Sequence, residues 1–543
     1  MTYLNTHTIG CALVLSASLL TGCGSSGSDD ASTSQSEVSG SVFASYMQGA
    51  AVSIYDTSGN LIAGPVTTNA QGRFTVKLDT AHLASALVFK SSGGEFTDEV
   101  TGAVTVGGAL STLLASDALS GSVDLSVNLT PSTTVVERLA SQHGKTLIEA
   151  QEAFESAFGF LPTPHVMPSD ASTANADATN EQKLAGLRAA AFSQLNNDLG
   201  LNADQQFDLI LQLADDLADD SLDGKSEATE LSVDGISLGN DIQSKYSQSF
   251  IAFKEGDKNK TSLTNTQIGT LPFAQLALSD SYKVQYVPGM MKAMEGKTTI
   301  KVKITDLEGT PATGLSPMLM PMMNMATHQH STPKGSFVED TEEAGTYLAT
   351  AYFLMASQMG NGMSMGYWDL EVNIGEESVH FFPPVMMAMG DTPKAKLQGQ
   401  NDEIPDMASG EMMSRPYYLF NNGLSTAGES HNFSIVLASK ESMMSFPMLS
   451  DSSTLNVGAD YELAINSILV EMSTDKANWI TATSNETGIW TGSALSGLTN
   501  GEEGTIYVRL TVNGEQKTDD GLAPDNVADE AMFFVTPSSG MEM

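Results

Sequence analysis

The chain has 543 residues, which at about 100–200 residues per domain predicts a modular protein of roughly three or four domains. Lys and Arg number 25 against 65 Asp and Glu, and the net charge of −40 excludes nucleic acid as an expected partner. The two cysteines, Cys11 and Cys23, both lie near the amino terminus. This placement excludes a disulfide framework and a Cys-based zinc site in the folded part of the chain.

The amino terminus has the features of a lipoprotein signal peptide. Residues 9–20 form an apolar stretch that is too short to span a bilayer, and the sequence Leu-Thr-Gly-Cys follows at residues 20–23. This sequence resembles the bacterial lipoprotein box, although residues 1–8 contain no Lys or Arg. The resemblance implies that residues 1–22 are removed and that Cys23 is diacylated. Gly24 then favours the outer membrane, with the protein facing the periplasm or the cell surface.

A flexible tether and a small β-module are expected next. Residues 23–38 are rich in Gly, Ser and Asp and lack apolar periodicity, as flexible linkers do. Residues 39–130 read as short alternating strands separated by turns, which predicts a β-sandwich. The sequence of residues 49–78 resembles the carboxypeptidase-regulatory-like, prealbumin-type modules of bacterial surface proteins. That resemblance carries no catalytic group.

The apolar period changes from two to about 3.6 after Pro131. Helical spacing recurs through residues 131–254, interrupted by a linker rich in Pro, Ser, Ala and Thr at residues 162–179. We therefore expect a helical unit whose apolar stripes pack against one another.

A segment with the spacing of a calcium loop follows the fourth predicted helix. Asp219, Ser221 and Asp223 occupy the first, third and fifth positions, and Glu230 occupies the twelfth. The same residues also fit the acidic C-terminus of a helix that ends at a glycine. Residues 231–240 do not have the pattern of the helix that follows a calcium loop. We favour the helix end and keep calcium as the alternative.

Two further β-modules are expected in the second half of the chain. Residues 281–384 return to period-two alternation, and residues 432–537 repeat the same order of strands and aromatic residues. The predicted fold class is therefore mainly β, with several immunoglobulin-like or prealbumin-like β-sandwich modules and an intervening α-helical unit.

Methionine is concentrated in one part of the chain. Of the 28 methionines, 21 lie in residues 290–448, and the densest run ends in His328 and His330. Thioether sulfur favours Cu(I) and imidazole favours Cu(II). In an extended strand the methionines of residues 318–325 divide between two faces, while the two histidines share one. The alternative is that the methionines fill the core or form a partner surface, because Met packs adaptably.

The same segment resembles a known family. The sequence of residues 301–306, the methionine run ending at His330, Gly-Thr-Tyr at residues 345–347 and the sequence of residues 363–372 together look like the YtkA-like domain. Members of that family are extracytoplasmic immunoglobulin-like sandwiches, often lipoproteins, and some are linked to copper handling. The resemblance implies the following candidate copper ligands: Met320, Met323, Met325, His328 and His330.

The sequence contains no motif of a common enzyme class. A nucleophile elbow, an HExxH helix, a phosphate-binding P-loop and a dinucleotide fingerprint are all missing from it, so catalysis is not expected. The first hypothesis is an extracytoplasmic, lipid-anchored protein that captures or handles copper. The alternative is a surface scaffold or adhesion lipoprotein of stacked β-modules with no metal function, whose methionines pack or bind a protein partner.

Overall fold

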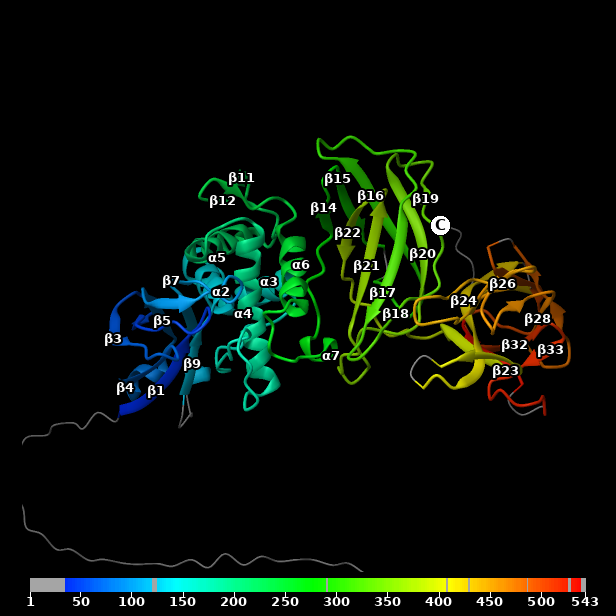
Figure 1. The fold of residues 1–543 in the computed structure, drawn as a ribbon, viewed down its shortest axis with the longest axis horizontal. Coiled ribbons are helices and arrows are strands. Elements are labelled where there is room, and N and C mark those ends of the chain that lie inside the picture. Colours follow the sequence, from blue (N-terminus) through cyan, green and yellow to red (C-terminus); the bar gives the residue numbers. More distant parts are fainter. Residues whose placement is uncertain are drawn as a thin grey trace, which may run out of the picture.

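A computed structural model describes residues 35–119, 125–289, 292–406, 409–427, 430–485, 487–525 and 529–538. Cys11, Cys23 and the signal peptide lie outside these residues. The chain is mainly β, with immunoglobulin-like tandem modules and one helical unit, and this confirms the predicted fold class. Figure 1 shows the four parts one after another along the longest axis, from blue strands through cyan and green helices to green and then orange strands.

The first part is a β-module with sheet orders β4-β1-β9 and β3-β2-β5-β8. β1 pairs antiparallel with β4 and parallel with β9. Alternate residues of β4 are buried, as Phe74, Val76 and Leu78 show, so the period-two pattern of the sequence is the pattern of burial. The elements are β1 (Gln35–Val42), β2 (Ala51–Asp56), β3 (Leu61–Thr67), β4 (Arg73–Asp79), η1 (Thr80–Ala84), β5 (Leu87–Ser92), β6 (Glu95–Thr97), β7 (Val104–Val106), β8 (Ser111–Leu114), α1 (Ser116–Leu119) and β9 (Leu125–Leu129).

The helical unit follows directly, and its helices α2, α3 and α4 begin at side-chain caps. Thr130, Thr146 and Thr179 each accept a hydrogen bond from the backbone three residues on, and Gly159 ends α3 in the left-handed conformation. The elements are α2 (Pro131–Gln142), α3 (Leu147–Phe158), α4 (Asn180–Asp198), η2 (Ala203–Gln205), α5 (Gln206–Asp216), η3 (Leu217–Asp219), β10 (Lys225–Ser226), β11 (Thr229–Glu230), β12 (Ser232–Val233), β13 (Ile236–Ser237), α6 (Ile242–Glu255) and α7 (Asn265–Ile268).

These two parts share one hydrophobic core. Buried residues from the strands and from α2 to α7 form a continuous cluster. Phe96 of β6 meets Phe207 of α5 edge to face at 5.5 Å between ring centroids, and Ser111 of β8 donates a hydrogen bond to the buried carboxylate of Glu137 on α2. The helices therefore cover the β-module as a second layer.

The middle module is a sandwich with sheet orders β14-β15-β16-β20-β19 and β18-β17-β21-β22. Its core contains Trp368, whose indole nitrogen donates to the carbonyl oxygen of Met355 at 3.0 Å. The strands are β14 (Leu276–Leu278), β15 (Tyr282–Val287), β16 (Gly296–Asp306), β17 (Met318–Asn324), β18 (Gln329–His330), β19 (Val338–Glu339), β20 (Thr346–Phe353), β21 (Tyr367–Ile374) and β22 (Glu377–Phe381).

The last module has sheet orders β23-β24-β25-β31-β30 and β29-β28-β32-β33, with β34 also on β32. Its first strands begin near residue 394, so the sandwich is longer than the expected 432–537. The strands are β23 (Lys394–Pro405), β24 (Met412–Ala427), β25 (Ser430–Ser439), β26 (Thr454–Leu455), β27 (Leu463–Ala464), β28 (Ile468–Ser473), β29 (Ile480–Thr481), β30 (Thr483–Ser484), β31 (Ile489–Leu495), β32 (Gly504–Val512), β33 (Glu515–Lys517) and β34 (Ala531–Val535).

No helix in the part of the chain that the structure describes has the length and apolarity to span a bilayer.

Candidate functional site

The methionine run forms β17, and its side chains alternate between two environments. Met318 is 58% exposed and Met320 is 39% exposed, whereas Met323 is fully buried in the core of the middle module. The sulfur of Met320 accepts a hydrogen bond from the Lys334 ammonium at 2.8 Å. Met320 and Met323 therefore lie on opposite faces of the sheet, and the structure does not bring the expected set of five ligands together.

The other three predicted residues line one cavity. Met325, His328 and His330 surround a space of about 260 Å³ where the middle module meets the last module. Seven further residues that the sequence did not connect to the site also line it. The full lining is Met325, His328, His330, Leu354, Met355, Lys394, Tyr418, Lys440, Met443 and Phe446.

His330 is the buried centre of this cavity, hereafter the His330 cavity. Its Nδ1 lies 2.8 Å from the carbonyl oxygen of Ser331, and its Nε2 lies 3.4 Å from the Met355 sulfur. A carbonyl oxygen can only accept, so Nδ1 carries the proton. Burial lowers the pKa of the imidazole below its usual value, the hydrogen bond to the Ser331 carbonyl opposes this, and the nearby charges of His328 and Lys440 lower the pKa further. The ring is therefore neutral, and Nε2 presents a lone pair.

The lone pair of His330 thus faces a thioether sulfur. With metal–nitrogen and metal–sulfur bonds of about 2.0 and 2.3 Å, a tetrahedral ion holds its nitrogen and sulfur ligands about 3.5 Å apart. The observed 3.4 Å between Nε2 and the Met355 sulfur fits that spacing. Met325 and Met443 add further sulfur to the same cavity, so the donor set is soft and suits Cu(I).

Two lysines line the cavity, and one of them acts against a bound cation. The Lys394 ammonium is paired with the carboxylate of Glu295, but Lys440 contributes positive charge that reaches His330. The charge of Lys440 adds a small effect to the lowering of the imidazole pKa by burial, and it would also repel a bound metal ion. A monovalent ion held by covalent bonds to soft ligands is disfavoured less by this charge than a divalent ion.

The possible calcium loop has a different structure. Glu230 is exposed on β11 and pairs with Lys225 of β10, while Asp219 accepts from the backbone of Ser221. The loop is organised instead by Asp216, which is fully buried and accepts hydrogen bonds from the backbone nitrogens of residues 223–225. Among the described residues, no group of three or more His, Cys, Asp or Glu side chains is placed to hold a metal ion.

No family model matches the chain, and no curated protein matches it. The YtkA-like and carboxypeptidase-regulatory-like resemblances stay predictions. Among solved structures, the Yersinia pseudotuberculosis adhesin InvE is 14% identical over 45% of this chain and 55% of its own length, with a TM-score of 0.13. Domains 5–6 of the S-layer protein SbsC are 11% identical over 49% of this chain and 100% of that chain, with a TM-score of 0.15. The Escherichia coli adhesin FdeC is 14% identical over 49% and 66% of the two chains, also at 0.15. At these TM-scores the likenesses do not bear on function.

Proposed function

We propose that this protein is an extracytoplasmic surface scaffold, a stack of modules held in fixed relative positions on a lipid tether. The observation that carries the proposal is buried packing across the junctions between its parts. A chain of independent domains would be joined by exposed, polar linkers with few contacts across them. Here side chains from both sides of each junction are buried against each other.

The junction between the helical unit and the middle module is apolar. Tyr367 and Phe382 belong to the middle module, yet both are buried in the hydrophobic cluster of the helical unit. The Gln358 amide also donates to the hydroxyl of Thr270 at 3.3 Å. Each buried aromatic side chain stabilises such a contact by about 1.5–3 kcal/mol.

The junction between the middle and last modules has a small core of its own. Tyr352 of β20, Phe420 of β24 and Val436 of β25 are buried together, with the two aromatic rings 5.6 Å apart. The Tyr352 hydroxyl donates to the side-chain oxygen of Asn422 at 2.9 Å, and the Lys297 ammonium donates to the Asn422 carbonyl at 2.7 Å. A rotation of one module against the other would expose these groups and break these hydrogen bonds.

The proposed scaffold acts by position and binding rather than by catalysis. Acylation of Cys23 would anchor it in the outer membrane. The expected tether of residues 23–38 is shorter at its end, because β1 already begins at Gln35, so residues 24–34 would connect the anchor to the first strand. The stack would then hold its later modules away from the membrane surface.

Small-angle X-ray scattering of the chain from residue 35 onward tests the stiffness of the stack. We expect one elongated particle whose scattering curve is reproduced by a single arrangement of the four parts. A curve that requires a broad ensemble of module orientations would contradict the proposal. The variant Tyr352→Ala, which removes a junction side chain and leaves the core of each module intact, should move the scattering toward such an ensemble.

A second function, Cu(I) binding, is favoured by the 3.4 Å approach of His330 Nε2 and the Met355 sulfur. The revised ligand set is Met325, His330, Met355 and Met443, with His328 at the exposed side. The set joins two modules, since Met443 follows β25 and the Ser331 backbone nitrogen donates to the Met443 carbonyl at 2.7 Å. A competition titration with a Cu(I) chelator tests this function.

A further inference from the structure

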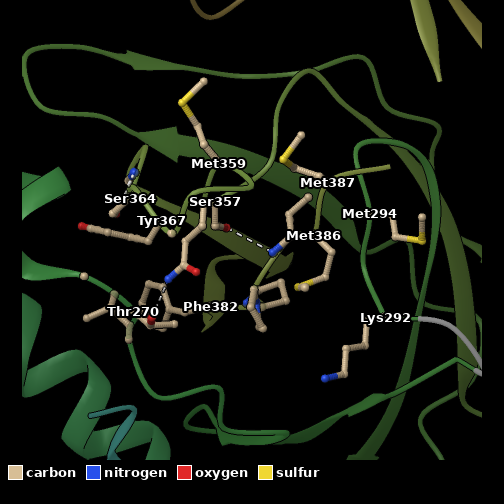
Figure 2. Close-up of a pocket in the computed structure, with 18 of the residues that line it drawn as sticks. Thr270, Lys292, Met294, Ser357, Met359, Ser364, Tyr367, Phe382, Met386 and Met387 are labelled. Carbon is tan, nitrogen blue, oxygen red and sulfur yellow. Dashed lines mark hydrogen bonds between the residues drawn. The ribbon is translucent and has the colours of Figure 1, made fainter. Parts of the chain in front are cut away.

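A second cavity lies where the chain passes from the helical unit into the middle module. It has a volume of about 760 Å³. Ligand sites for small molecules commonly fall between about 300 and 1,000 Å³ and are mostly apolar. Figure 2 shows the labelled side chains gathered around this space, hereafter the methionine pocket. Its methionines are Met294, Met359, Met386, Met387 and Met389.

The backbone around the methionine pocket is fixed. Tyr367 and Phe382 are buried at its floor with their rings edge to face, 5.9 Å apart. The Met386 backbone exchanges hydrogen bonds of 2.8 Å with Ala293 and Glu295, which places Met386 beside Met294. The walls therefore do not need to form when a ligand arrives, and only the flexible thioether side chains adjust.

The methionine side chains are exposed to an unusual degree for apolar groups. Met359, Met386 and Met387 are each 46–48% exposed, and Met389 is 86% exposed. Covering this surface with an apolar chain would stabilise the complex by about 25 cal/mol for each Å² removed from water. The pocket therefore favours a ligand with a long apolar part.

One charged residue lines the pocket, and its sign is opposite to that of the chain. Lys292 is exposed beside Met294, and no carboxylate is among the lining residues. Across the residues that the structure describes, Lys292 forms no ion pair, although the chain has 65 acidic residues. An ammonium at the edge of an apolar pocket is complementary to an anionic head group.

We propose that the methionine pocket binds an anionic amphiphile, a molecule with one carboxylate and a linear acyl chain. The acyl chain would pack on the methionines above Tyr367 and Phe382, and the carboxylate would pair with Lys292. This function goes beyond the scaffold and is independent of the His330 cavity, because the two sites have no lining residue in common.

Calorimetric titration of the chain from residue 35 onward with dodecanoate, below its micelle concentration, tests the proposal. We expect one saturable site, weaker binding of dodecanol, and no binding of dodecyltrimethylammonium. Lys292→Glu should weaken dodecanoate binding by about tenfold or more, because an attraction becomes a repulsion next to apolar walls. Lys396→Glu, which makes the same charge change on exposed β23, should leave it unchanged.

A second pair of variants tests the place of the acyl chain. Met387→Trp would fill the pocket from an exposed position and should abolish binding, while Met412→Trp on β24 should not. Absence of saturable dodecanoate binding would overturn the proposal. It would also be overturned if dodecanoate affinity were the same in Lys292→Glu as in the unchanged protein, or if the cationic amphiphile bound equally well.

Discussion

The Nε2 atom of His330 and the sulfur of Met355 lie 3.4 Å apart, although His330 ends β18 of one sheet and Met355 follows β20 of the other. The proton of the neutral ring is on Nδ1, bonded to the Ser331 carbonyl, so neither atom of the close pair supplies a proton to the other. Two acceptors that face each other without a donor gain no hydrogen bond. In the proposed Cu(I) function, a metal ion between the two atoms would use both lone pairs.

The ionisation of His330 is the first property that follows from this geometry. We expect its pKa to lie below about 6.5, because burial disfavours the charged ring. His380 should titrate in the other direction, because the hydrogen bond to Asp369 raises its pKa. Titration of the imidazole Cε1–H signals by NMR measures both, and a His330 pKa at or above 6.5 would show that the ring is not held neutral.

The stability of the fold should depend on pH through the same residue. Since the folded pKa of His330 is lower than the unfolded value, its contribution is fully present above about pH 6.5. The contribution is lost as the pH falls from about 6.5 to the folded pKa. Denaturant unfolding of the His330→Gln variant should show a smaller loss of stability over this range than the unchanged protein shows. Equal slopes in the two proteins would contradict the assignment.

Cu(I) affinity should depend on Met355 and not on Met320. We expect Met355→Leu to weaken Cu(I) binding by about tenfold or more, since a soft ligand is replaced by an apolar group of similar size. Met320→Leu is the matched control, because its sulfur faces Lys334 on the other face of the sheet. Competition with a chromophoric Cu(I) chelator measures both affinities. Loss of Cu(I) affinity in the Met320 variant alone would contradict the revised ligand set and support the set predicted from the sequence.

The two methionines of β17 should also differ in their effect on stability. Met323→Ala removes a fully buried side chain and should reduce the free energy of unfolding by about 2–5 kcal/mol. Met320→Ala removes a partly exposed side chain and should change it by about 0.5 kcal/mol or less. Chemical denaturation followed by Trp fluorescence measures both values, and similar losses in the two variants would contradict the burial described for β17.

Sequence periodicity was sufficient to predict the fold class but missed the start of the last module. The apolar period of two becomes the alternating burial of β4 and β16, and the period near 3.6 becomes the buried faces of α3 and α5. β23 was missed because its 12 residues contain few apolar side chains, of which Leu397 and Ile404 are buried. Its place in the sheet is decided by pairing with β24, which is a tertiary contact.

The candidate metal site was predicted only in part, for a similar reason. The candidate ligands were chosen by residue type and density alone. Strand alternation places two of them, Met320 and Met323, on opposite faces of the sheet, so they cannot bind the same ion. Met355 and Met443 lie just after β20 and β25, and they reach His330 because the ends of these strands meet at a module junction. Sequence spacing contains no information about that meeting.

The lipid anchor is a prediction of the sequence at residues outside the described part. Cys23→Ala should prevent acylation, so the protein should remain unprocessed or leave the membrane fraction. Cell fractionation with metabolic labelling by a fatty acid analogue measures both effects. Cys11→Ala is the matched control and should be processed normally. If the Cys23→Ala variant still associates with the membrane and is still labelled, the prediction of a lipoprotein is contradicted.

The fixed arrangement of the modules is the central claim, and a distance between the first and last modules tests it most directly. The chain from residue 35 onward contains no cysteine, so Ser58→Cys and Glu502→Cys can be introduced and spin-labelled without background. Both positions are exposed, one in the first module and one in the last. Pulsed electron spin resonance should give one narrow distance distribution, which Tyr352→Ala broadens. A broad distribution in the unchanged stack, as flexibly joined domains would give, would contradict the scaffold.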